Sequence, residues 1–179
     1  MTDEEYQAIV SRIQTGSLLI GIDRSMARKF YTDVPLSRIE EQTGEAPYFE
    51  KAVVFGAFIG GPLALLASFV MAVFAFGWGA VLAIPASVVL YFIFTGASSM
   101  PRNGMAGITV LLVLALASLY LNWFPSSYMA WYAVLIAAAL WSARLIYSAA
   151  TVFIRAFVVR NRRAFEFLAP YIQLKDANT

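Results

Sequence analysis

The side chains with the clearest chemical potential in this sequence are arginines and hydroxyls near its C-terminal end. They recur at intervals that place them on one face of a predicted helix. Guanidinium groups bind carboxylates and phosphates, so this stripe predicts a contact with anionic lipid or with a partner. The alternative is that the arginines only extend toward lipid head groups from a membrane-spanning helix. The stripe consists of Arg144, Tyr147, Ser148, Thr151, Arg155 and Arg162.

Arg144 lies deepest in an apolar segment. It follows Tyr128 by about 24 Å of helix at 1.5 Å per residue, which places it near one face of a bilayer. The sequence has no acidic residue between Lys51 and Arg163 that could neutralise this charge. The nearest candidate partners in the chain are therefore Glu45 and Glu50.

The residue types that most enzymes need are missing. The sequence contains no cysteine and no histidine, which removes thiolate nucleophiles, imidazole bases and the commonest metal ligands. Serine and threonine hydroxyls without a neighbouring base do little acyl chemistry. We expect no catalytic residue, no metal site and no cofactor, so the chain is not expected to be an enzyme.

Two groups of basic residues flank the apolar part of the chain. Such groups attract anionic lipid by about 1 kcal/mol per charge, and they also fix the orientation of membrane helices. Nucleic acid is not an expected partner, because three arginines without interleaved aromatic residues are a weak signal. Since acidic residues predominate before residue 52, we expect the two chain ends to touch. The basic groups are Arg160, Arg162 and Arg163 after the apolar part, and Arg24, Arg28 and Lys29 before it.

The N-terminal group belongs to a predicted helix over residues 18–30. Its apolar residues, from Leu18 to Phe30, are expected on one face, with the basic residues off that face. Such a helix lies flat on a membrane surface or docks onto a partner through the same apolar face. The sequence leaves both alternatives open.

A ladder of small residues, each four apart, follows immediately. Small residues at this spacing let membrane helices approach closely, because lipid provides no hydrophobic drive for association. The ladder predicts either packing within the chain's own bundle or a contact between subunits. Replacement of Gly60 by Leu or Ile is expected to disrupt an assembly. The ladder consists of Ala52, Gly56, Gly60, Ala64, Ser68 and Ala72.

These features lie on an apolar framework. Apolar residues make up 60% of the chain and charged residues 13%, whereas soluble domains have roughly 45–50% and about 25%. A helix of about 20 apolar residues crosses a bilayer, and four such segments are present. We therefore predict an all-α integral membrane protein whose long fourth helix extends into the cytoplasm. The predicted parts are a cytoplasmic helical segment (1–51), four transmembrane helices (52–76, 80–99, 105–123 and 128–159) and a basic cytoplasmic tail (160–179).

Charge and aromatic residues predict the orientation. Lysines and arginines concentrate before residue 52 and after residue 159, with one, Arg102, between the second and third segments. The other two connections lack basic residues and carry tryptophans and tyrosines, as the outer membrane interface does. Both termini are therefore expected in the cytoplasm, with the chain in the inner (plasma) membrane.

The function that fits this pattern best is a non-enzymatic subunit or scaffold of a larger membrane assembly, such as a secretion, transport, energy-transducing or defence complex. Its expected partners are anionic lipids at the cytoplasmic face and other membrane subunits or copies of itself. The alternative is a homo-oligomeric ion channel or small transporter, in which hydroxyls would line a pore and arginines at the inner mouth would favour anions.

Overall fold

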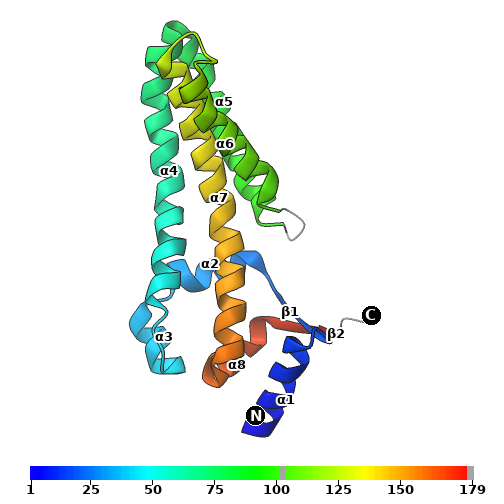
Figure 1. Ribbon diagram of the computed structural model, residues 1–179. Helices are drawn as coiled ribbons and strands as arrows, with labels where there is room; N and C mark the ends of the chain where they lie inside the picture. The colour runs from blue at the N-terminus through cyan, green and yellow to red at the C-terminus, as the bar shows by residue number, and fades with distance from the viewer. Residues whose placement is uncertain (101–103, 177–179) are drawn as a thin grey trace. The chain divides into compact units, whose positions relative to one another are not determined.

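The computed structural model describes residues 1–100 and 104–176, so Arg102 of the predicted middle loop lies outside the described residues. Helices make up 82% of the described chain, which confirms the predicted helical fold apart from one small sheet (Figure 1). The helices are α1 (Asp3–Gln14), α2 (Arg24–Asp33), α3 (Leu36–Thr43), α4 (Tyr48–Phe76), α5 (Ala80–Ser98), α6 (Ala106–Leu121), α7 (Ser127–Arg160) and α8 (Arg162–Leu168). Short 3-10 turns η1 (Gly77–Gly79) and η2 (Ala169–Tyr171) and the strands β1 (Leu18–Ile22) and β2 (Ile172–Asp176) complete the fold.

Contacts divide the chain into two compact units. We call residues 1–54 together with residues 149 onward the terminal module, and Phe55–Ser148 the helical module. The terminal module therefore joins both ends of the chain, which the sequence had assigned to separate segments. Helices α4 and α7 each contribute one end to it.

The sheet of the terminal module corrects the predicted helix over residues 18–30. Leu18–Ile22 is instead a strand that pairs antiparallel with β2, from Leu18 opposite Asp176 to Ile22 opposite Ile172. Leu18 and Ile20 are buried while Leu19 is 56% exposed, so burial alternates with the period of a strand. Helix α2 begins only after this strand.

The C-terminal segment is also folded. Helix α7 ends at Arg160, and the side chain of Asn161 accepts a hydrogen bond from the Ala164 backbone to cap α8. Strand β2 then pairs with β1. Residues 160–176 of the predicted basic tail are therefore part of a packed unit, and the predicted contact between the chain ends is confirmed.

The core of the terminal module comes from both chain ends. Tyr31, Ile39 and Phe157 are completely buried. The ring of Phe30 lies 5.1 Å from that of Tyr31 and 6.4 Å from that of Phe157. Burial of each such aromatic side chain stabilises the module, and α2 and α3 are thereby held against the end of α7.

The helical module is built from α4, α5, α6 and α7 (Figure 1). The chain reverses at η1, where Gly77 has a φ of 53°, a conformation that glycine adopts without strain. Antiparallel packing then brings Tyr91 of α5 beside Gly61 of α4. The helices follow the predicted apolar segments closely, for example α5 at Ala80–Ser98 against the predicted 80–99.

Two helical stretches are long and apolar enough to cross a membrane by length and composition. They are Tyr48–Ser98, which includes the turn η1, and Ser127–Arg160, while Ala106–Leu121 is a shorter apolar helix. Only 22% and 39% of their most apolar windows are buried, whereas the core helix of a soluble protein is mostly buried. Four transmembrane helices remain a prediction.

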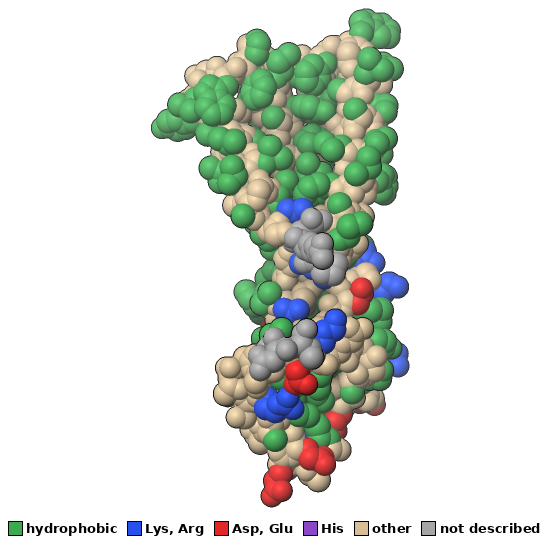
Figure 2. Space-filling view, turned by 90° about the vertical axis from the view of Figure 1, so that its right-hand side faces the viewer, with side chains coloured by type: hydrophobic (Ala, Val, Ile, Leu, Met, Phe, Trp, Pro, Cys, Tyr) green, Lys and Arg blue, Asp and Glu red, His purple; other side chains and the backbone are tan. Residues whose placement is uncertain are grey.

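The surface of the helical module is correspondingly apolar. Large side chains such as Leu82 and Phe92 are 78% and 68% exposed, and Tyr120 is 91% exposed. In Figure 2, hydrophobic side chains cover the visible face of these helices, whereas most acidic and basic side chains lie over the terminal module. Exposed apolar surface on this scale marks contact with a membrane or with another protein.

Candidate functional site

The terminal module contains an apolar groove with charged residues along its lining. Met26 and Phe30 of α2, Ile154 of α7 and Leu168 of α8 contribute to its walls, and its volume is about 360 Å³. Small-molecule sites in proteins typically occupy about 300–1,000 Å³ and combine apolar walls with a few polar groups. The groove is therefore the best candidate for a binding site in the described residues.

The groove depends on how α2 begins. The carboxylate of Asp23 accepts hydrogen bonds from the Ser25 hydroxyl and from the backbone amides of Ser25 and Met26. These hydrogen bonds, that of the Ser25 hydroxyl first, lower the pKa of the carboxyl group. This cap ends the strand β1 and starts a helix in the required direction. Ala27 then packs against the module with no exposed surface, which brings Met26 and Phe30 to the groove.

Charges of both signs line the groove. Lys29, Asp33 and Arg38 contribute to the lining, and all three are exposed. The hydroxyl of Thr32 donates to the Asp33 carboxylate over 2.6 Å. Within the part of the chain that the structure describes, neither Lys29 nor Arg38 forms a salt bridge, so the groove carries a net positive charge.

Lys29 was predicted from the sequence as a contact residue, but the groove itself was not. Arg24 and Arg28, predicted with Lys29 as lipid or partner contacts, lie on α2 without lining the groove and are half-buried. The missing signal is long-range: residues around 26 and 168 meet only because the chain ends pack together. Arg38 was not predicted from the sequence as a contact residue. It lies on the short helix α3, which brings it to the groove.

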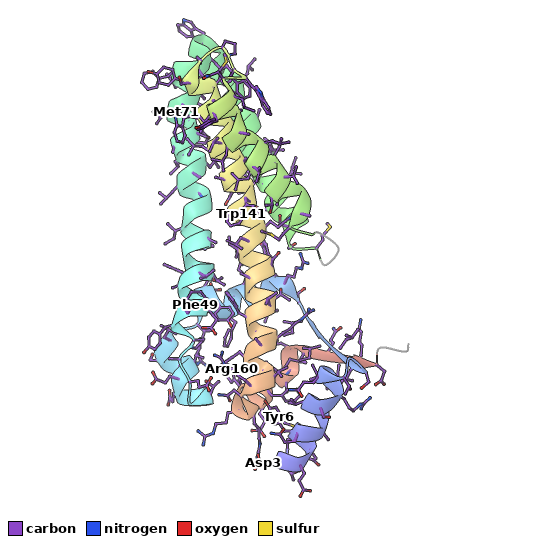
Figure 3. The ribbon with its side chains drawn as sticks, viewed as in Figure 1. Asp3, Tyr6, Phe49, Met71, Trp141 and Arg160 are labelled. Carbon is purple, nitrogen blue, oxygen red and sulfur yellow. The ribbon has the colours of Figure 1, made fainter. Side chains whose placement is uncertain are left out.

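Two of the predicted contact arginines form ion pairs within the terminal module. Arg160 lies 3.3 Å from a carboxylate oxygen of both Glu45 and Glu50, and Figure 3 shows it near the end of α7. Arg162 pairs with Asp3 and with Glu166, and these hydrogen bonds raise the pKa of its guanidinium group. Their charges therefore hold the chain ends together.

The other predicted arginines differ from these two. Arg155 and Arg163 are exposed, and their role as lipid or partner contacts stays a prediction. Arg144 donates a hydrogen bond to the Gly104 carbonyl and lies 4.8 Å from the centre of the Phe94 ring. Glu45 and Glu50, the nearest acidic candidates for Arg144 in the sequence, both pair with Arg160.

Two tyrosines connect the module's elements in different ways. The Tyr6 hydroxyl of α1 donates to the carbonyls of Val158 and Val159 over 3.0 and 2.7 Å, at the end of α7 where carbonyls lack helical partners (Figure 3). The Tyr31 hydroxyl is buried without a hydrogen-bond partner among the described residues. Burial, and then the negative charge of Glu50, raises the pKa of Tyr31.

The ladder of small residues behaves differently along its length. Ser68 and Ala72 are buried, Gly60 and Ala64 are half-buried, and Ala52 and Gly56 are exposed. The close approach occurs instead at Gly61, where an added Cβ would lie 2.9 Å from the Tyr91 hydroxyl oxygen. A Cβ at Gly60 would meet only the Ser142 hydroxyl, at 4.0 Å. Regular spacing of four residues could not identify Gly61, which lies one position off the ladder.

Comparison with known proteins adds no functional assignment. No family model, curated protein or solved structure matches the chain.

Proposed function

We propose that this chain is a non-enzymatic, multi-pass inner-membrane protein that serves as a subunit or scaffold of a larger membrane assembly. In this proposal α4, α5, α6 and α7 cross the membrane and the terminal module lies in the cytoplasm. The single observation that carries the proposal is the pairing of the two chain ends in one module, while the chain between them forms helices whose large apolar side chains are exposed.

The joined chain ends favour an even number of membrane crossings. Strands β1 and β2 pair along their whole length, and Tyr6 of α1 bonds to the end of α7. Both ends must therefore lie on the same side of any membrane that the intervening chain crosses. Four helices between the ends satisfy this condition, and the basic residues of the module favour the cytoplasmic side.

The hydroxyls of the helical module favour a scaffold over a pore. Ser68, Ser98 and Ser118 donate to carbonyls of their own helices, over 2.6–2.7 Å. Ser87 additionally lies 2.6 Å from the Tyr132 hydroxyl. A hydroxyl that is satisfied within its own bundle is not presented to a permeating ion.

Native mass spectrometry after gentle extraction with a terminal tag tests the proposed function. We expect different polypeptides to co-purify in defined ratio, because a scaffold binds partners through its exposed surfaces. A single symmetric homo-oligomer that conducts ions in a planar bilayer would overturn the scaffold proposal in favour of a channel.

A further inference from the structure

The groove of the terminal module has the chemistry of an amphiphile site. Its walls include Met26, Phe30, Ile154 and Phe167, which come from three different helices. Phe30 and Phe167 have ring centres 6.4 Å apart, so the aromatic walls pack against each other across α2 and α8. An apolar space bounded by separate elements that already pack together is suited to a flexible hydrocarbon chain.

The cations along the groove differ from several other cations of the module, which are already paired. Elsewhere Arg12, Arg160 and Arg162 are neutralised by carboxylates of the same chain. Lys29 and Arg38, by contrast, are exposed at the groove and outnumber Asp33. Cations that line an apolar groove complement a ligand with an anionic head and an apolar tail.

We propose that this groove binds an acyl chain of an anionic lipid, with Lys29 and Arg38 contacting its head group. A bilayer beside the module would supply such lipids, so the source of the ligand rests on the proposed membrane location. The groove itself does not depend on that location. A free fatty acid, like an acidic phospholipid, combines an anionic head with an apolar tail. Competition with oleate separates these two sources of the ligand.

The direct test is photo-crosslinking to the full-length chain in neutral detergent. The probe is phosphatidylglycerol with a photoactivatable diazirine on one acyl chain, and mass spectrometry identifies the labelled peptides. We expect labelling of peptides that contain Met26, Phe30 or Phe167, competed by unlabelled phosphatidylglycerol. Labelling confined to residues 55–148 would overturn the proposal, because the probe would then only coat the apolar helices.

Charge substitutions test the head-group contact. Lys29→Ala and Arg38→Ala should each weaken phosphatidylglycerol binding by about fivefold, from about 1 kcal/mol per charge, and leave phosphatidylcholine binding unchanged. Lys175→Ala is the matched control, because Lys175 is exposed on β2 and does not line the groove. Equal effects on both lipids, or an equal effect of the control, would contradict the assignment. Thermal unfolding confirms that the variants are folded.

One further ligand, oleate, and one blocking variant identify the occupant. Oleate that competes as well as phosphatidylglycerol would assign the site to any anionic head, whereas no competition would assign it to a phosphate head. Met26→Trp should abolish groove labelling by filling the space. A co-purified polypeptide released by Met26→Trp, with no lipid bound, would overturn the lipid assignment. None of these outcomes depends on the subunit proposal, which native mass spectrometry tests separately.

Discussion

At the scale of single residues, Gly61 and Gly56 give a matched comparison on one helix. Gly61→Leu forces a side chain against Tyr91, since even a Cβ would lie 2.9 Å from its hydroxyl. Overpacking of this kind typically costs about 1–3 kcal/mol. At Gly56, by contrast, an added Cβ would meet no neighbouring atom within 4 Å, so Gly56→Leu has room for its side chain to begin.

We therefore expect thermal unfolding in detergent to show a lower midpoint for Gly61→Leu and little change for Gly56→Leu. The opposite order would show that α4 does not approach α5 at Gly61. A change in oligomeric mass for Gly56→Leu alone would support the predicted role of the exposed part of the ladder between subunits.

Tyr6 and Tyr31 provide a second comparison at the residue scale. Tyr6→Phe removes the donor to the Val158 and Val159 carbonyls and should cost about 1 kcal/mol of unfolding free energy. Tyr31→Phe removes a buried hydroxyl that has no hydrogen-bond partner among the described residues, so it should be neutral or stabilising. Chemical denaturation of both variants measures the difference. Equal destabilisation by the two substitutions would contradict the hydrogen bonds assigned to Tyr6.

At the scale of elements, the pH dependence of unfolding tests the cap that Asp23 makes at the start of α2. Hydrogen bonds from Ser25 and Met26 lower the pKa of Asp23, so the ionised carboxylate stabilises the folded state. That contribution is complete above the unfolded pKa of about 3.9 and is lost as the pH falls through the folded value. Asp23→Ala should cost about 1 kcal/mol at pH 7.

The pH profile of unfolding provides the control for this prediction. The stability difference between wild type and Asp23→Ala should shrink as the pH falls below about 4. Glu41→Ala, at an exposed position of α3, should show no such difference. A constant difference across the acidic range would contradict a cap made by the ionised carboxylate.

The apolar helices were predictable from sequence because their signal is local. Runs of apolar residues separated by Gly77-Trp78-Gly79, by residues 100–104 and by Pro125 define α4 to α7 without any tertiary information. The strand β1 was not predictable in this way, because its partner β2 lies about 150 residues later. The apolar pattern of this segment fits both a helix and a strand. The secondary structure that it adopts is decided by the segment it packs against, and that segment is a strand.

The candidate site was only partly predictable for the same reason. Lys29 was identified by charge, but the groove requires α7, α8 and β2 to meet α2. The ion pairs of Arg160, and that of Arg162 with Asp3, likewise join residues more than 100 positions apart. Sequence alone could therefore name basic residues without distinguishing those paired inside the module from Lys29 and Arg38 along the groove.

At the scale of the whole molecule, the chain leaves the terminal module after residue 54 and returns to it at residue 149. Basic residues and paired strands both favour chain ends on one side of a membrane, with four crossings between them. An even number of crossings also explains why the turn at Gly77–Gly79 and the connection before α7 lack charge. The subunit proposal and the supply of lipid to the groove both depend on this topology.

Cysteine labelling in intact cells measures this topology most directly, because the chain contains no cysteine of its own. Single substitutions Ser17→Cys, Trp78→Cys, Gly104→Cys and Ser127→Cys report on the terminal module and on each connection, with a membrane-impermeant maleimide as the probe. We predict labelling from outside only for Trp78→Cys and Ser127→Cys, and labelling of the other two only after lysis. Labelling of Gly104→Cys from outside would contradict four crossings, and labelling of Ser17→Cys from outside would contradict a cytoplasmic terminal module.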